Sequence, residues 1–305
     1  MKMKWFQFVL ALSCIASSAA FLPSAFAQDA QPRDGEMVKI RFDALWKLQY
    51  LPNAPVRDAA VIARDLKSPS ISPDGSQVVM FKRGLDGEPN ALSRWSRGDV
   101  QTIVRDEQVS MFITWNDEKN ISVRQFDRPF FENGEKLNFT LDGKGARLRD
   151  RKPLRSEAVR AFDADDVILL VRQDTRTLQA ISDTSSDRYF GPVVSPDSRF
   201  VVYNGLTTGV HLFDVEANAV VFIGLHGTHP TFSPDGRYLM YTDTRDDGHT
   251  FTQGNLVVID LREKTFRFVS NPDGEIRIHG TLSRDGRFVA YETDDGRIVR
   301  AGLFE

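Results

Sequence analysis

The sequence predicts an all-β fold, a six-bladed β-propeller of four-stranded antiparallel blades, because one short pattern recurs along the chain. The pattern is a turn resembling S-P-D-G followed by an apolar run. It is clearest in HPTFSPDGRYLMYTDT (229–244) and HGTLSRDGRFVAYETD (279–294). Self-similarity at a spacing of tens of residues is typical of stacked supersecondary units. Each such unit buries its apolar faces against its neighbours.

The turn occurs in six registers, each with an aspartate in third place. Complete copies begin at Ser72, Ser195, Ser233 and Ser283, and degenerate copies begin at Trp115 and Ala161. The aspartates are 43, 46, 34, 38 and 50 residues apart: Asp74, Asp117, Asp163, Asp197, Asp235 and Asp285. Six registers predict six blades. A β-sandwich with coincidental turns is the alternative, and it does not explain aspartates in register.

The composition of the turn and of the run after it indicates a tight hairpin that leads into a buried strand. Proline presets φ, aspartate bonds to nearby backbone, and glycine accepts positive φ. Gly236 is therefore expected to have a left-handed conformation, so that a β-branched residue there costs on the order of 1 kcal/mol or more. The runs 200–203, 238–241 and 288–291 are apolar at successive positions, which predicts strands buried on both faces.

The last unit is short, so the ring needs a strand from elsewhere in the chain. We expect Met37–Phe42 to donate the fourth strand of the last blade, which would leave no open sheet edge. The propeller domain would then span 37–305. Residues 43–66 can form a strand, a helix or a plug.

The first residues of the chain resemble a secretory signal peptide. A basic start and an apolar stretch end in Ala25-Phe26-Ala27, which predicts a signal peptide over 1–27 and a disordered leader over 28–36. The protein is then periplasmic or secreted. A lipoprotein anchored through Cys14 and a retained membrane anchor are the alternatives. Cys14 is the only cysteine, so a cleaved chain has no disulfide.

Charge and hydropathy narrow the partner classes. The formal net charge is −3, and cleavage would also remove Lys2 and Lys4, so no basic field for nucleic acid is expected. No segment after the leader has 18 successive apolar residues, so no transmembrane helix is expected there. We expect a monomer that binds an envelope protein or a glycan.

The S-P-D-G turns, each complete copy but the last with a proline three residues before its serine (Pro69, Pro192, Pro230), resemble the WD40-like propeller repeats of the TolB family. They also resemble propeller domains of prolyl-oligopeptidase-type peptidases. The resemblance covers about 66–305 and implies a β-propeller in the cell envelope. A separate N-terminal domain as in TolB does not fit into the forty residues before the first turn. A peptidase of this type is not expected, because the chain has no G-x-S-x-G motif for the nucleophile.

No catalytic motif or cofactor motif is present, and no cofactor is predicted. The five histidines lie between 211 and 279, and His229 and His279 both stand four residues before the turn serine. We expect these two imidazoles side by side at the rim of the central channel, with His226 nearby and Glu157 as a further rim residue. Histidine pairs bind transition metals and act as acid and base.

A second candidate site is the loop of the second blade, where Phe130 and Phe131 stand among charged residues. Aromatic side chains on a loop tip can anchor a partner, or they can pack on the neighbouring blade.

Two functions remain from the sequence. The preferred one is an exported, non-catalytic binding scaffold of the bacterial cell envelope. The alternative is a metal-assisted hydrolase or lyase with its site at the channel mouth, supported only by the histidines and Glu157.

Overall fold

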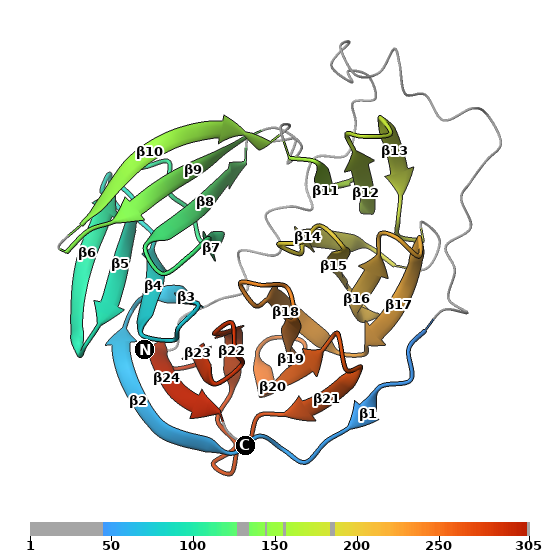
Figure 1. The fold of residues 1–305 in the computed structure, drawn as a ribbon. Helices are drawn as coiled ribbons and strands as arrows, with labels where there is room; N and C mark the ends of the chain where they lie inside the picture. Colours follow the sequence, from blue (N-terminus) through green and yellow to red (C-terminus); the bar gives the residue numbers. More distant parts are fainter. Residues whose placement is uncertain (1–44, 127–133, 144, 155–156, 184–186, 304–305) are drawn as a thin grey trace.

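The computed structural model describes residues 45–126, 134–143, 145–154, 157–183 and 187–303. Within these ranges the chain forms 24 β-strands, which lie in six sheets around a central axis (Figure 1). The predicted six-bladed β-propeller is confirmed. The described part of the chain contains no helix that is both long and apolar enough to span a bilayer.

The first three blades follow one another along the chain, with the innermost strand first. Blade 1 consists of β3 (Lys67–Ile71), β4 (Gln77–Lys82), β5 (Ala91–Ser96) and β6 (Asp99–Arg105). Blade 2 consists of β7 (Ile113–Trp115), β8 (Asn120–Phe126), β9 (Gly134–Leu141) and β10 (Ala146–Pro153). Blade 3 has three strands in the described ranges: β11 (Val159–Ala164), β12 (Val167–Arg172) and β13 (Thr177–Ala180).

The remaining blades complete the ring. Blade 4 consists of β14 (Tyr189–Val194), β15 (Phe200–Gly205), β16 (Gly209–Asp214) and β17 (Ala219–Gly224). Blade 5 consists of β18 (Gly227–Phe232), β19 (Tyr238–Asp246), β20 (Phe251–Asp260) and β21 (Thr265–Phe268). Blade 6 consists of β22 (Arg277–Leu282), β23 (Phe288–Thr293), β24 (Arg297–Leu303) and, from the start of the chain, β2 (Val56–Arg64).

The fourth strand of blade 6 is a different segment from the one we expected. Strand β2 pairs antiparallel with β24, from Val56 opposite Leu303 to Arg64 opposite Arg297. This position was predicted for Met37–Phe42, which lies outside the described residues. The difference has a physical reason: an outermost strand needs backbone partners more than apolar side chains, and β2 is largely exposed.

The segment before β2 runs along the outside of the ring (Figure 1). The Trp46 N–H donates to the Val221 carbonyl of blade 4 over 2.7 Å. Strand β1 (Gln49–Tyr50) then pairs in parallel with β21 of blade 5, and Ala54 forms a bridge with Val269. This belt therefore joins the outer edges of blades 4 and 5 before the chain enters blade 6.

The S-P-D-G turn repeats its hydrogen bonds from blade to blade. In blade 5, Ser233 Oγ donates to Asp235 Oδ1 over 2.7 Å and accepts the Tyr238 N–H over 2.9 Å. Asp235 Oδ1 also accepts the Arg237 N–H over 3.1 Å. The same three bonds form in the turns that begin at Ser72, Ser195 and Ser283. The serines are buried, so each turn satisfies its polar groups internally.

The turn of blade 3 does not follow this pattern. We expected Asp163 to be its turn aspartate, but Asp163 lies within β11 and pairs with Ile168. The turn consists of Asp165 and Asp166, with φ of 49° and 64°. Two successive residues with positive φ make the tight two-residue hairpin that needs no serine. In blade 2, by contrast, Asp117 Oδ1 accepts the Lys119 and Asn120 N–H groups at the expected position.

The second strands of the blades are buried on both faces, as predicted. All six residues of β15 are buried, and Leu239, Met240 and Tyr241 of β19 are buried as well. Their two faces contribute to different clusters: Met240 packs with blade 6 and Leu239 with blade 4. This packing buries large apolar areas away from water, and each Å² buried stabilises the fold by about 25 cal/mol.

The turn glycines lie at the contacts between blades. Gly75 of blade 1 lies against the Phe288 ring of blade 6, and Gly286 of blade 6 lies against the Tyr238 ring of blade 5. Arg300 covers the Phe288 ring at 4.3 Å and donates to the Gly75 carbonyl over 2.7 Å. Each turn therefore shapes its own blade and also contacts the blade before it.

Two glycines test these two roles separately, because they have the same backbone conformation and different neighbours. Gly236 has φ of 75°, and a Cβ there would make only ordinary van der Waals contacts, at 3.4 Å from Pro196 Cδ and Asp197 Oδ1. We therefore expect Gly236→Ala to cost about 1 kcal/mol of unfolding free energy. A Cβ on Gly75 would lie 2.2 Å from Phe288 Cδ2, so Gly75→Ala should cost about 2–4 kcal/mol. Urea denaturation measures both values. Equal losses would contradict the interlocking of the turns between blades.

Candidate functional site

A repeated bulge lies in the innermost strand of four blades. In each, one residue has positive φ where the pairing with the second strand shifts register. These residues are Ser68 (47°), Gly191 (60°), His229 (51°) and His279 (52°). A bulge bends the strand and redirects the side chain it carries. In each of these four blades, the bulge therefore sets the direction of one side chain on the strand nearest the central channel.

Blades 5 and 6 both place a histidine at this bulge. The ring centroids of His229 and His279 lie 4.0 Å apart, with 69° between the ring planes. The structure thus brings together the two imidazoles that the turn alignment puts in equivalent positions. Their binding role stays a prediction.

The partner of His279 is a carboxylate that the sequence analysis missed. Nδ1 of His279 lies 3.1 Å from Oε2 of Glu292, whose side chain is only 2% exposed. The same oxygen lies 3.4 Å from the Ser68 N–H of blade 1. A buried carboxylate accepts hydrogen bonds, so His279 donates from Nδ1, and its Nε2 remains as an acceptor while the ring is neutral.

The other imidazole lies in a closed environment. Nδ1 of His229 is buried and has no hydrogen-bond partner among the described residues. Burial lowers the pKa of His229 well below its usual range, and the neighbouring His279 lowers it further. His229 is therefore neutral at pH 7. An enclosed polar atom without a partner suits a hydroxyl or amide group of a ligand.

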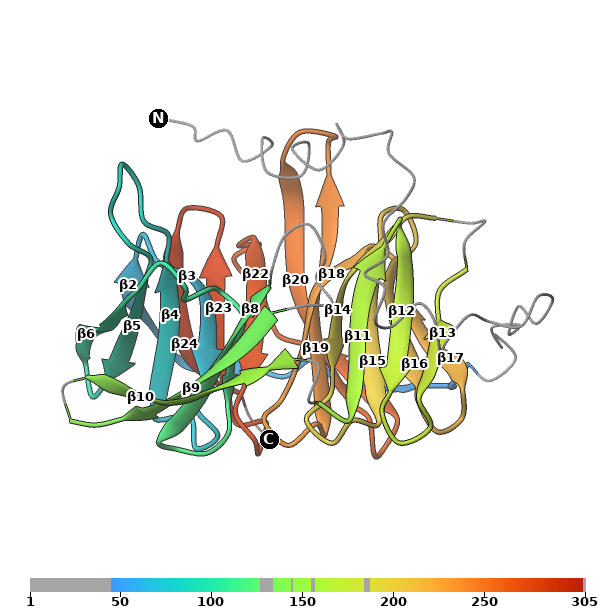
Figure 2. The ribbon, with the colours of Figure 1, turned by 90° about the horizontal axis from the view of Figure 1, so that it is seen from above.

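An aromatic side chain flanks this pair. Phe251, at the start of β20, lies edge-on to His229 with centroids 6.3 Å apart. It belongs to the β19–β20 hairpin, which extends beyond the other blades in Figure 2. The cluster therefore combines an apolar ring with two imidazoles and a buried carboxylate.

The remaining predicted site residues have different surroundings. His226 is exposed, and its carbonyl accepts the Thr244 N–H over 3.0 Å. Glu157 forms ion pairs with Arg124 (3.2 Å) and Lys136 (3.5 Å) of blade 2. The carboxylate beside the histidine pair is thus Glu292. Phe130 and Phe131 lie outside the described residues.

The donor atoms of this site do not gather as metal ligands do. Among the residues that the structure describes, no three His, Cys, Asp or Glu side chains lie close enough to hold an ion. Sites for transition metals normally take at least three protein ligands.

Another histidine, His211, supports the loops of blade 4. The Thr208 hydroxyl donates to Asp187 Oδ2 over 2.6 Å and lies 2.8 Å from His211 Nε2, so His211 donates to it. The His211 ring stacks on Tyr203 with centroids 5.3 Å apart. Burial lowers the pKa of His211 to about 4, and Asp187 offsets part of this shift. The three side chains brace the loop between β15 and β16.

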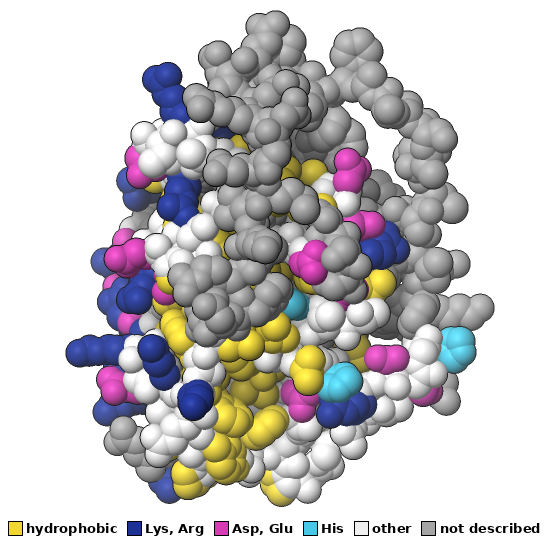
Figure 3. All heavy atoms as spheres, turned by 90° about the vertical axis from the view of Figure 1, so that its right-hand side faces the viewer, with side chains coloured by type: hydrophobic (Ala, Val, Ile, Leu, Met, Phe, Trp, Pro, Cys, Tyr) yellow, Lys and Arg dark blue, Asp and Glu magenta, His cyan; other side chains and the backbone are white. Residues whose placement is uncertain are grey.

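Figure 3 shows the molecule from the right-hand side of Figure 1. Hydrophobic side chains form a patch on this side, and histidine side chains reach the surface near it.

Known structures resemble this chain at the level of the fold. TolB from Acinetobacter baumannii is 13% identical, with 79% of this chain and 55% of that chain covered and a TM-score of 0.34. An oligogalacturonate lyase in complex with manganese is 13% identical, with 80% and 78% covered and a TM-score of 0.41. The β-propeller domain of Cps50 (Swd1) from Myceliophteria thermophila is 9% identical, with 82% and 100% covered and a TM-score of 0.48.

These likenesses show the fold alone. The neighbours are TolB-like and WD40-like propellers, and the chain matches about half the length of the TolB structure. No protein-family model and no curated protein sequence matches this chain.

The buried histidines predict acid sensitivity. His211 has a pKa of about 4 in the folded chain and about 6.5 when unfolded, so the unfolded state takes up the proton first. The contribution of His211 to the free energy of unfolding is therefore fully present above about pH 6.5. It falls as the pH drops toward about 4, by up to about 3 kcal/mol. His229 acts in the same direction.

Urea denaturation between pH 7.0 and 4.5 measures this loss. His211→Gln, which keeps a donor and cannot be protonated in this range, should flatten the pH dependence. His249→Gln changes an exposed histidine of the β19–β20 hairpin and serves as the control. Equal pH dependence in His211→Gln and the wild type would show that His211 is not the titrating group. Asp187 does not interfere, because hydrogen bonds from Thr208 and nearby backbone outweigh burial and lower its pKa to about 2.

Proposed function

We propose that this chain is an exported, non-catalytic binding scaffold of the bacterial cell envelope, and that it holds a protein partner on one face of the ring. This face, here the loop face, carries the connections between blades and the loops between second and third strands. The opposite face carries the S-P-D-G turns.

The distribution of exposed apolar side chains supports this assignment. The described residues include thirteen large hydrophobic side chains that are exposed. Seven belong to the loop face: Leu85, Met111, Phe112, Phe190, Leu206, Leu225 and Phe251. The other six lie on the belt or on the last strands of their sheets, and none lies in an S-P-D-G turn. Apolar side chains gathered on one face are typical of an interaction surface.

Two of these side chains lie on short loops of blade 4, and one of these loops is braced by hydrogen bonds. Leu206 is 52% exposed in the β15–β16 loop, which the Asp187–Thr208–His211 hydrogen bonds brace from below. Leu225 is 67% exposed at the connection between blades 4 and 5. Rigid loops lose little entropy on binding, so apolar groups on them contribute more to affinity.

The cluster of His229, His279, Glu292 and Phe251 lies at the same face. A polar group of the partner can form a hydrogen bond with His229 Nδ1 or His279 Nε2, while Phe251 contacts its apolar part. The proposal of export rests on the leader over 1–27, whose composition predicts cleavage after Ala27.

The loop face can be tested with matched pairs of leucines. The purified protein carries a photo-crosslinker in the β15–β16 loop and is exposed to an envelope extract. Leu206→Ser/Leu225→Ser should lower the yield of the crosslinked protein about tenfold or more, because two apolar anchors are lost. Leu148→Ser/Leu178→Ser changes two other exposed leucines, on β10 and β13, and should leave the yield unchanged.

Equal yields from the two leucine pairs would show that the loop face does not select the partner. Crosslinks to carbohydrate alone would replace the protein partner with a glycan.

The alternative of a metal-assisted hydrolase or lyase has its own measurement. Protein purified without a histidine tag should contain below about 0.1 equivalent of zinc or manganese, because too few ligands converge. The value should not change in His229→Ala/His279→Ala. About one equivalent of metal, lost in this variant, would favour the enzyme over the scaffold.

A further inference from the structure

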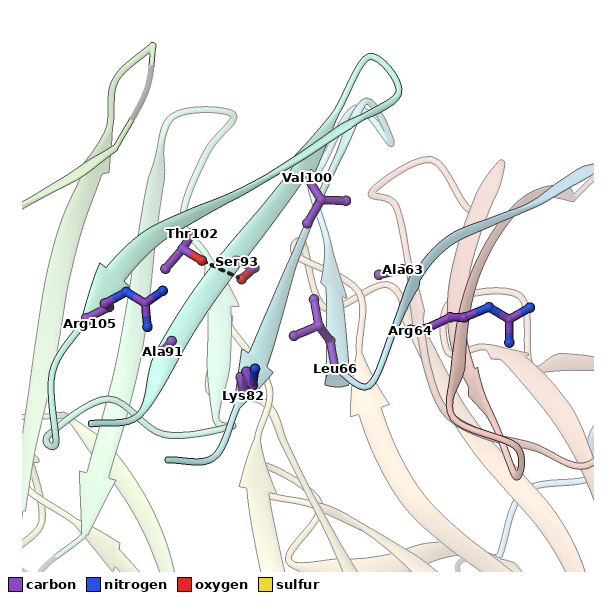
Figure 4. A pocket seen from close by; sticks show the side chains of 9 residues that line it. All are labelled: Ala63, Arg64, Leu66, Lys82, Ala91, Ser93, Val100, Thr102 and Arg105. Carbon is purple, nitrogen blue, oxygen red and sulfur yellow. Dashed lines mark hydrogen bonds between the residues drawn. The ribbon is translucent and has the colours of Figure 1, made fainter. Parts of the chain in front are cut away.

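A cavity of about 330 Å³ lies at the junction of blades 6 and 1, on the outer part of the ring. Strands β4, β5 and β6 form one wall, and β2 with the start of blade 1 forms the other (Figure 4). Nearer the axis this junction is apolar, since Leu66 and Met80 pack there with Ala290 and Ile298. The cavity is thus the place where the packing between the two blades opens outward.

The strand register places two cations on one face of blade 1. Lys82 lies opposite Ala91, and Ala91 lies opposite Arg105, so the three form a row across β4, β5 and β6. Directly opposite residues share a face, and neighbouring strands are about 5 Å apart. Between the two cations, Ala91 has a short side chain and lines the cavity. A group bound above Ala91 would have a positive charge on each side.

Two hydroxyls form the next row of the same wall. Ser93 is buried, with Oγ 3.4 Å from Thr102 Oγ1. Two hydroxyls carry two protons, and their mutual bond uses one of them. The other can be donated to a group in the cavity. Figure 4 shows this pair beside the Arg105 side chain.

The electrostatics of the cavity are one-sided. Its lining includes Arg64, Lys82 and Arg105 and no carboxylate. Within the described ranges, neither Lys82 nor Arg105 forms an ion pair with an acidic side chain. The Arg64 side chain points away from the other two (Figure 4). Lys82 and Arg105 are exposed cations on the same wall, and an anion placed between them would accept charge-assisted hydrogen bonds from both.

The rest of the lining is apolar, with Ala63, Leu66 and Val100 around the cations. The volume exceeds what a bare phosphate needs. We propose that this cavity binds a small organic ligand through one oxyanion group, a phosphate, sulfate or carboxylate held by Lys82, Arg105 and the Ser93–Thr102 hydroxyls. The apolar part of the ligand contacts the wall formed by β2 and Leu66. This site lies between blades 6 and 1 on the outer part of the ring, and it does not rest on the function proposed for the loop face.

Isothermal titration calorimetry at constant ionic strength tests the proposal with three probes: phenyl phosphate, inorganic phosphate and phenol. We expect saturable binding of one phenyl phosphate per chain, weaker binding of inorganic phosphate, and no measurable binding of phenol. Lys82→Met/Arg105→Gln removes both charges and leaves an elongated side chain at each position. It should weaken binding of phenyl phosphate at least about tenfold, the loss expected for charge-assisted hydrogen bonds.

Two further variants separate a built site from general attraction. Lys47→Met/Arg147→Gln removes the same charges from exposed positions elsewhere and should bind phenyl phosphate like the wild type. Ala91→Leu keeps both cations and fills the space between them, so it should abolish binding. If Ala91→Leu lowers the melting temperature severely, Thr102→Val replaces it, with severalfold weaker binding expected.

Three results would overturn the proposal. One is the absence of saturable binding of phenyl phosphate by the wild type. Another is unchanged affinity in Lys82→Met/Arg105→Gln. The third is an equal loss in the Lys47→Met/Arg147→Gln control, which would show that net charge rather than this cavity attracts the anion.

Discussion

The hydrogen bond between a buried serine and the aspartate two residues later is the interaction on which this structure depends. It recurs at 2.6–2.7 Å in four blades, and each time the same serine also accepts the first N–H of the following strand. The bond therefore sets the register of the two innermost strands. It also leaves a residue at positive φ, Ser198 in blade 4 and a glycine in the other three blades, and these glycines lie against the preceding blade. One local interaction thus determines both the blade and its spacing from the neighbour.

The parts of the fold that could be predicted are those that this turn controls. Strands after it are buried on both faces and read as continuous apolar runs, so blades 1, 4, 5 and 6 were visible in the sequence. Blade 3 uses Asp165 and Asp166 in a two-residue turn without a serine, so its register could not be read from the motif. Strand β2 was missed because an exposed outermost strand has no apolar pattern.

The candidate site was predictable to the same extent. Counting back from the turn serine placed His229 and His279 in equivalent positions, and a shared bulge keeps them equivalent in space. Glu292 could not be found in this way, because it lies in another strand and belongs to no motif. One signal was available: it is the only acidic residue in the apolar run FVAYE, and a buried carboxylate in such a run needs a partner.

The pairing of β2 with β24 has a consequence for how the molecule is made. Strand β2, the first strand of the six blades to be synthesised, can pair only after its partner β24 has also been synthesised. Until then one sheet edge stays unpaired. The closing contact joins strands more than two hundred residues apart, and it forms slowly because closing so long a loop costs entropy. An unpaired strand edge that persists during this interval favours association with other chains, so the pairing of β2 with β24 also removes a site of aggregation.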